Sequence, residues 1–196
     1  MQIKKDEIEM AIVKAAEREF LHHGFKGASM RRIGSRAHTS PGNLYTYFPN
    51  KIGLFTRVMG DVVEKTEAFI EMHINMTETL DFKFSGSIES ILAAYPDLFP
   101  FELLLSPAFA ILLNPSSCEG TSFLMERERL LSYFNNHLNH HMELESGNPM
   151  TPIISNGIVE AILRLNKMQI SHEEKVSHLI NYIKYQSLGI AKDIVT

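Results

Sequence analysis

The segment from Ser40 to Lys51 constrains the fold more than any other part of this chain, because it places capping, buried and polar residues at helical spacing. The hydroxyl of Ser40 suits a helix N-cap, and Pro41 suits the first helical position, where no backbone N–H is required. Leu44 and Phe48 are four residues apart and define a buried side. The pattern predicts a short helix with a polar, aromatic outer face and a basic exit.

Two more helices are predicted directly before this segment. Ser29 can cap a helix that continues to Ala37 and carries Met30 and Ile33 on one face, and a tight turn then leads into the next helix. Further upstream, an apolar stripe of about four turns ends at Gly24, since glycine favours the left-handed conformation past a helix terminus. The stripe consists of Ile8, Ile12, Ala15, Ala16 and Phe20. Three short helices in this order predict a helix-turn-helix domain.

The distribution of charge singles out the same region. The whole chain carries 19 Lys or Arg and 23 Asp or Glu, a net charge of −4. Residues 1–65 carry 11 basic and 7 acidic side chains, a net charge of +4, so residues 66–196 carry 8 and 16, a net charge of −8. Between Phe20 and Gly60 there are six basic residues and no acidic one. An acid-free run inside a helix-turn-helix pattern favours binding to nucleic-acid phosphates over a merely solvated surface.

Three blocks of the N-terminal sequence carry a family resemblance. They are Gly24-Phe25-Lys26-Gly27-Ala28-Ser29, residues 33–40, and Gly42-Asn43-Leu44-Tyr45-Thr46-Tyr47-Phe48-Pro49-Asn50-Lys51. Roughly the first quarter of the chain thereby resembles the DNA-binding domain of the tetracycline-repressor (TetR) family of bacterial transcriptional regulators. The resemblance implies an all-α fold with a helix-turn-helix DNA-binding domain in residues 1–50 and a helical effector-binding and dimerisation domain in residues 51–196. It also implies a homodimer on double-stranded DNA.

The sequence departs from the usual family pattern at three positions. Gly34 stands where the family usually has Ala, and His38 stands where it has Gly at the turn. Histidine tolerates a positive φ better than most residues, so the turn can still form. Pro41 replaces a Lys that many relatives carry, which removes one possible DNA contact. The base preference of relatives therefore cannot be carried over to this chain.

The resemblance implies which side chains contact DNA. Tyr45, Tyr47 and Lys51 match positions that hold the DNA backbone in relatives, and hydroxyl and ammonium groups suit phosphate. The alternative for either tyrosine is packing in the core of the small domain. Asn43 is the best-equipped base reader, because its amide can pair bidentately with adenine. The other expected contacts are Pro41, Gly42 and Thr46 at base edges, Arg31 and Arg32 at phosphates, and the capping residues Ser29 and Ser40.

A long helix and a broken helical region are predicted downstream. Residues 51–76 read as one amphipathic helix that links the DNA-binding domain to the rest of the chain. Residues 82–115 are rich in aromatic side chains and contain four prolines, so helices there must be short or kinked. We interpret this region as lining a pocket for a mostly apolar ligand, with ordinary core packing as the alternative. The candidate lining residues are Phe99, Phe101, Leu105, Phe109, Phe123 and Met125.

The last two predicted helices carry apolar stripes that suit close antiparallel packing, and Gly157 is small enough to permit a close crossing. In the TetR family the final two helices form a four-helix bundle between subunits, so the resemblance implies a dimer interface here. The alternative is burial within the same domain. The candidate interface residues are Ile154, Ile158, Ile162, Leu179, Ile183 and Ile190.

Other features narrow the class of protein. The single cysteine, Cys118, excludes an intrachain disulfide and suits a cytoplasmic location. No apolar run reaches the ~20 residues of a membrane span, and no signal peptide is expected. No cofactor motif or catalytic constellation is found, so an enzyme is not expected. His137, His140 and His141 share one helix face, which leaves a metal site open against a solvated polar face.

These observations predict a DNA-binding transcriptional regulator, expected to be a repressor that binds a palindromic operator and is released by a mostly apolar small-molecule effector. The alternative is an interaction or scaffolding protein of the same fold with only non-specific DNA binding. The sequence does not specify the effector, the operator, the regulated genes, or repression as opposed to activation.

Overall fold

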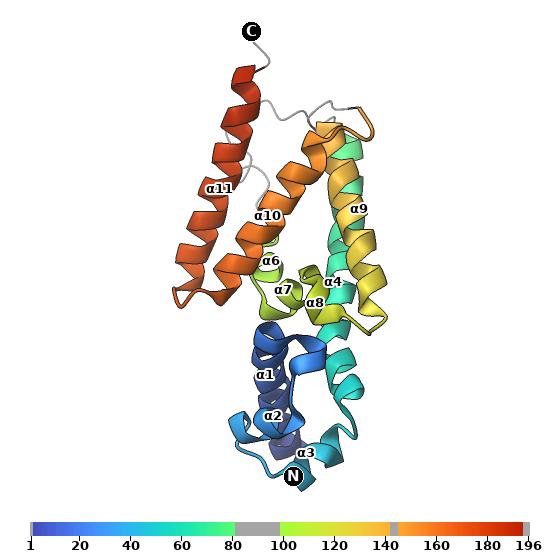
Figure 1. Ribbon diagram of the computed structural model, residues 1–196, viewed down its shortest axis with the longest axis vertical. Helices are drawn as coiled ribbons and strands as arrows, with labels where there is room; N and C mark the ends of the chain where they lie inside the picture. Colours follow the sequence, from blue (N-terminus) through green and yellow to red (C-terminus); the bar gives the residue numbers. More distant parts are fainter. Residues whose placement is uncertain (1, 81–98, 142–144, 194–196) are drawn as a thin grey trace. The chain divides into compact units, whose positions relative to one another are not determined.

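The computed structural model describes residues 2–80, 99–141 and 145–193, with side chains described for residues 5–75, 99–140 and 145–186. Within these ranges every regular element is an α-helix (Figure 1), which confirms the expected all-α fold. The helices are α1 (Gln2–Gly27), α2 (Met30–Arg36), α3 (Pro41–Tyr47), α4 (Lys51–Leu80), α6 (Phe101–Leu104), α7 (Pro107–Leu113), α8 (Pro115–Cys118), α9 (Phe123–His141), α10 (Met150–Lys167) and α11 (His172–Asp193).

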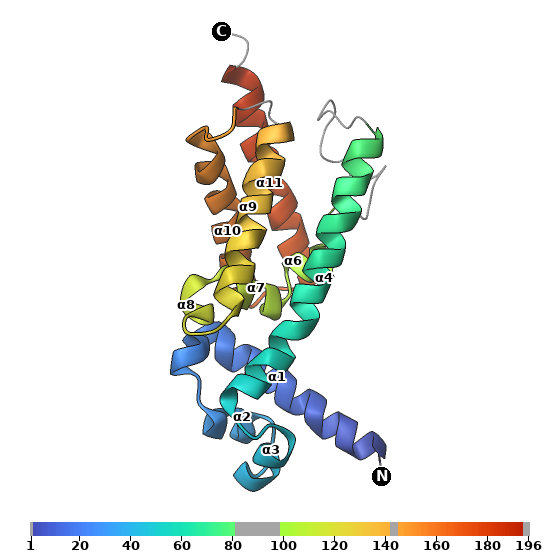
Figure 2. The same cartoon turned by 90° about the vertical axis from the view of Figure 1, so that its right-hand side faces the viewer.

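The chain divides into two compact units. The head unit comprises Met1–Lys65 and Pro107–Arg127, and the body unit comprises Thr66–Ser106 and Glu128–Thr196. In the head unit, α1 packs against α2, α7 and α8, and α2 packs against α3. Figure 2 shows α1, α2 and α3 together with the N-terminal turns of α4. The functional division expected at residue 50 stays a prediction, because it concerns what each part of the chain binds.

The core of the head unit is built from the apolar stripes of its helices. Ile12 and Phe20 of α1, Ile33 of α2 and Leu44 of α3 are completely buried. Phe55 of α4 lies at the centre of an aromatic cluster, with ring centroids 4.8 Å from Phe20, 5.0 Å from Phe25 and 5.6 Å from Phe123. Burial of these large rings is the main stabilising term of the unit.

Gly24 interrupts α1 with a backbone conformation of φ 64° and ψ 176°. The expected break at this glycine is therefore confirmed, although a further turn follows it to Gly27. A Cβ at Gly24 would lie 2.9 Å from the carbonyl oxygen of Ser116 and 3.3 Å from the Cα of Ser117. Glycine is required twice at this position, by the positive φ and by the close approach of α8.

The helices of the middle region are short, as expected from its prolines. Pro107 begins α7 and Pro115 begins α8, where each proline needs no N–H partner. The side chain of Asn114 accepts a hydrogen bond from the Ser116 amide at 3.1 Å and caps α8. The remainder of the predicted broken region, residues 82–98, lies outside the described residues.

The body unit contains the close crossing expected between α10 and α11. A Cβ at Gly157 would lie 2.5 Å from the hydroxyl oxygen of Tyr182, so the glycine makes room for this ring. Asn166 is buried and donates to the carbonyl oxygens of Ile162 at 3.1 Å and Leu104 at 3.4 Å, which ties α10 to α6. Among the described residues, no helix combines the length and apolar character that crossing a membrane requires.

Candidate nucleic-acid interface

The helix α3 is held by the local signals that its sequence predicts. Ser40 has an extended backbone, and its hydroxyl accepts a hydrogen bond from the Asn43 amide at 3.2 Å. Pro41 occupies the first helical position. Leu44 and Phe48 are buried, so both core assignments are confirmed. These contacts fix which face of α3 points outward.

The turn between α2 and α3 also has the expected geometry. Ser29 caps α2 by accepting a hydrogen bond from the Arg32 amide at 3.5 Å. His38 has a φ of 52°, and the following residue, Thr39, donates its N–H to the Gly34 carbonyl oxygen at 3.0 Å. A Cβ at Gly34 would lie 3.5 Å from Leu44 Cδ2, an ordinary contact distance, so the Ala usual in the family would also fit.

The outward face of α3 is polar, aromatic and free of Lys and Arg. Pro41, Gly42 and Thr46 are exposed, Tyr45 is 48% exposed, and Asn43 and Tyr47 are partly exposed. Neither tyrosine is fully buried in the core. Contact of this face with DNA stays a prediction.

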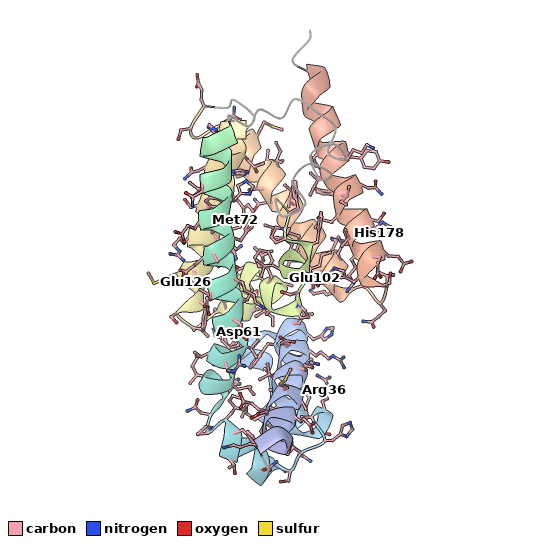
Figure 3. All side chains as sticks on the ribbon, turned by 180° about the vertical axis from the view of Figure 1, so that it is seen from behind. Arg36, Asp61, Met72, Glu102, Glu126 and His178 are labelled. Carbon is pink, nitrogen blue, oxygen red and sulfur yellow. The ribbon has the colours of Figure 1, made fainter. Side chains whose placement is uncertain are left out.

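A buried carboxylate missing from the sequence prediction organises the arginines of α2. Glu19 of α1 is 0% exposed. Its Oε1 accepts hydrogen bonds from Arg32 Nε at 2.6 Å and from the Ser29 amide at 3.0 Å, and its Oε2 accepts one from Arg36 Nη1 at 2.7 Å (Figure 3, where Arg36 is labelled). The signal was present, because Glu19 falls three and four residues after Ala16 and Ala15 on the apolar stripe of α1.

The pKa of Glu19 reflects this environment. Burial alone would raise the pKa of its carboxyl group. Hydrogen bonds from Arg32 and from the Ser29 amide, together with the charges of Arg32 and His23, outweigh burial and hold the pKa below its usual value. Glu19 therefore stays ionised and binds α2 to α1.

The segment between Phe20 and Gly60 carries less net positive charge at its surface than its six basic residues suggest. Carboxylates from other parts of the chain form ion pairs with four of the six. Arg32 and Arg36 pair with Glu19. Lys26 Nζ lies 2.6 Å from Glu119, and Arg57 lies 2.9 Å from Asp61 and 3.5 Å from Glu9. Within the described side chains, no ion pair is found for the other two cations, Arg31 and Lys51. All three arginines of α2 are exposed, but Arg32 and Arg36 are engaged by Glu19, so Arg31 is the one better placed for phosphate.

Lys51 has a structural role in addition to the expected DNA contact. Its Nζ donates to the carbonyl oxygens of Lys26 at 3.2 Å and Ala28 at 3.1 Å, and it lies 4.9 Å from the centroid of the Phe25 ring. These contacts join the start of α4 to the α1–α2 connection. Since an ammonium group has three protons, one donor remains for a phosphate.

The six candidate pocket residues are divided between the two units. Phe99, Phe101 and Leu105 belong to the body unit, where the first two rings stack with centroids 6.0 Å apart. The other three belong to the head unit: Phe109 is buried in its core, Phe123 packs on Phe55, and Met125 is 77% exposed. Neither unit brings all six side chains together, and the pocket stays a prediction.

The candidate dimer residues differ in what they leave at the surface. Ile154, Ile162 and Leu179 are buried within the chain itself, so packing inside the body unit accounts for their apolar character. Ile158 and Ile183 are partly exposed, and the side chain of Ile190 lies outside the described residues. Among the described side chains, the large apolar ones exposed on the same two helices are Met150, Ile153 and Tyr185. A subunit interface here stays a prediction and would use this exposed set.

One member of the histidine cluster, His137, contacts a histidine of another helix. His137 Nε2 of α9 lies 3.0 Å from His73 Nε2 of α4, and the side chain of His141 lies outside the described residues. No group of three His, Cys, Asp or Glu side chains among the described residues is arranged to hold a metal ion.

Two capped helices joined by a turn with a positive φ, packed on a third helix and exposing a polar face, define a helix-turn-helix DNA-binding protein. Residues 12–58 match the family model described as bacterial regulatory proteins of the tetR family. This match identifies the N-terminal part of the chain as a tetR-family helix-turn-helix domain, the DNA-binding part of a bacterial regulatory protein rather than of an enzyme.

The solved structures to which the chain is similar include regulators from two bacteria. The chain is 18% identical to a transcriptional regulator (TerR/AcrR family) from Aquifex aeolicus, with a TM-score of 0.49, covering 91% of this chain and 98% of that one. It is 13% identical to a tetR-family transcriptional regulator from Streptomyces coelicolor, with a TM-score of 0.44, covering 95% of this chain and 83% of that one. No curated protein matches the chain.

Proposed function

We propose that this protein is a cytoplasmic bacterial repressor that binds a palindromic operator as a homodimer and is released by a small-molecule effector. The observation that carries the proposal is the outward face of α3. Its hydroxyl, amide and phenol groups are held at the surface by a capped helix whose other side is anchored in the core. Such a helix fits the major groove, and two copies about 34 Å apart would reach successive grooves of one operator.

DNA affinity in this proposal comes from a small set of backbone contacts. Arg31 and Lys51 supply charge, Tyr45 and Tyr47 supply hydroxyl donors, and the Ser29 and Ser40 caps lie at helix N-termini, which favour anions. The remaining α2 arginines are engaged by Glu19. Because few side chains contact phosphates, a larger share of the operator affinity must come from the residues that face the bases.

Release by the effector requires coupling along the chain. The helix α4 begins at Lys51, beside the carbonyl groups that this lysine holds, and continues as one helix to Leu80, beyond the head unit. An effector that prefers one arrangement of the body unit would shift the population of α4 positions and thereby the spacing of the two recognition helices. The aromatic rings of Phe99 and Phe101, which stack within the body unit, favour a mostly apolar effector.

The salt dependence of DNA binding tests the phosphate contacts. Arg31 and Lys51 of both subunits neutralise about four phosphates per dimer, which lowers the association constant by roughly 100- to 200-fold between about 50 and 200 mM salt, since bound counterions are released. Fluorescence anisotropy with a labelled operator, selected from random duplexes, measures this slope. An association constant indifferent to salt contradicts the proposal. Selection without an enriched palindrome favours the scaffolding alternative, with non-specific binding alone.

Gly42→Ala separates folding from DNA binding. Apart from the adjacent residues and the backbone of its own helix, no atom lies within 4 Å of a Cβ placed at Gly42, so the variant is expected to fold and to gain up to about 0.5–1 kcal/mol of helix stability. The added methyl group nevertheless occupies the face that approaches base edges, so operator affinity should fall about tenfold. Gly60→Ala, also in open space but on α4, is the matched control. Equal operator affinity of the two variants contradicts groove insertion of α3.

A further inference from the structure

The side chain of Asn43, the expected base reader on α3, is hydrogen-bonded within the helix-turn-helix. Its Nδ2 donates to Thr39 Oγ1 at 2.7 Å. Its backbone N–H donates to the Ser40 hydroxyl at 3.2 Å. Thr39 and Asn43 are both partly exposed, so the pair lies at the surface rather than in the core. The residues that start α3 therefore fix the backbone and the amide of Asn43 together.

The hydrogen bond to Thr39 leaves free the groups that base reading needs. A carboxamide has two N–H donors and one carbonyl acceptor. One N–H is engaged by Thr39, so a second N–H and Oδ1 remain. Adenine presents N7 as an acceptor and N6 as a donor in the major groove, which is the complement of this remaining pair.

We propose that Thr39 is a specificity-determining positioning residue, which holds the Asn43 amide in the orientation from which its second N–H and Oδ1 read an adenine edge. Thr39 contacts no base itself in this arrangement and acts through Asn43. The proposal rests on sequence-specific DNA binding, the function proposed above.

The expected size of the effect follows from the strength of the hydrogen bond. A hydrogen bond between two uncharged groups at such a position favours the bonded orientation of the amide by about two- to tenfold. Because the amide is then already ordered before DNA binds, less conformational entropy is lost on binding. Losing this bond should reduce discrimination at one base pair by the same factor. Affinity for non-specific DNA should not change, because phosphate contacts do not involve the amide.

Selection from random duplexes, followed by affinity measurements on operators altered at single positions, tests the proposal with the full-length protein. Thr39→Val keeps the shape of the side chain and removes the acceptor, Thr39→Ser keeps the hydroxyl, and Asn43→Ala removes the reader. The expected result is that Thr39→Val loses about two- to tenfold of the preference at the same base pair that Asn43→Ala affects, while Thr39→Ser retains it. Thr39→Ala replaces Thr39→Val if valine disturbs the turn.

Two results overturn the proposal, and they are distinguishable. If the wild-type protein enriches an operator and Thr39→Val shows the same preference at every position, Thr39 does not orient the reader, whereas the proposed function stands. If the wild-type protein enriches no sequence, the proposed function itself fails and the role of Thr39 fails with it.

Discussion

Replacing Arg32 and Arg36 together with methionine is expected to destabilise the head unit by about 3–5 kcal/mol, because Glu19 would be left as a buried carboxylate with only His23, 3.9 Å away, as an ion-pair partner. Methionine retains much of the arginine side-chain volume, so Glu19 stays covered while both guanidinium groups are lost. Of the hydrogen bonds to its carboxylate, the one from the Ser29 amide at 3.0 Å would remain. Chemical denaturation followed by circular dichroism measures the loss.

The same double substitution should reverse the direction in which the contribution of Glu19 to the free energy of unfolding changes with pH. In the wild type the pKa of Glu19 is lowered on folding, so its stabilising contribution is present above the unfolded pKa and is lost as the pH falls through the folded pKa. Without the two arginines, burial dominates and raises the folded pKa. The contribution of Glu19 then becomes less favourable as the pH rises through that pKa.

Two further variants isolate the charge effect. Arg31→Met removes an exposed arginine of the same helix and should change the free energy of unfolding by less than about 0.5 kcal/mol. Adding Glu19→Gln to the double variant keeps an acceptor for the Ser29 amide and removes the buried charge, so much of the lost stability should return. A double variant as stable as Arg31→Met shows that Glu19 is not paired as described.

Gly24→Ala is expected to cost about 2–4 kcal/mol, from two sources that act together. A φ of 64° with a ψ of 176° is a region that essentially only glycine occupies, which accounts for about 1–3 kcal/mol. The new methyl group would also lie 2.9 Å from the Ser116 carbonyl oxygen, and a backbone atom cannot rotate away from it. The helix α8 must shift, which disturbs its packing on α1.

Gly60→Ala is the matched control for this prediction as well. Gly60 lies inside α4, and apart from the adjacent residues and the backbone of its own helix no atom lies within 4 Å of a Cβ there, so alanine should be neutral or stabilising by up to about 0.5–1 kcal/mol. Thermal or chemical denaturation of both variants gives the comparison. If Gly24→Ala unfolds at the same denaturant concentration as Gly60→Ala, the strain at Gly24 has been assigned wrongly.

Features of the helix-turn-helix that depend on near neighbours could be predicted from the sequence. A cap acts over three residues, as at Ser29 and Ser40, and an apolar stripe acts over three or four, as at Leu44 and Phe48. The positive φ of His38 followed from its place between two such helices. Each of these signals acts within about one helical turn of the residue that carries it.

Contacts between distant segments could not be predicted in the same way. Glu19 pairs with Arg32 and Arg36, which lie 13 and 17 residues later in the sequence. Counting charges between Phe20 and Gly60 includes the two arginines but leaves out Glu19, so the count misses their pairing. Phe109 was grouped with Phe99 because both lie in one aromatic stretch, yet the two belong to different compact units. Periodicity identifies a buried face but not the helix that covers it.

The membership of α7 and α8 in the head unit has a consequence for the order of protein synthesis. The last residue of this unit, Arg127, leaves the ribosome after Thr66–Ser106 of the other unit has already been made. A nascent chain that ends at Lys65 therefore lacks the buried α7 and the α8 backbone that covers Gly24. The DNA-binding end is encoded first, but its core is completed only after nearly two thirds of the chain has been translated.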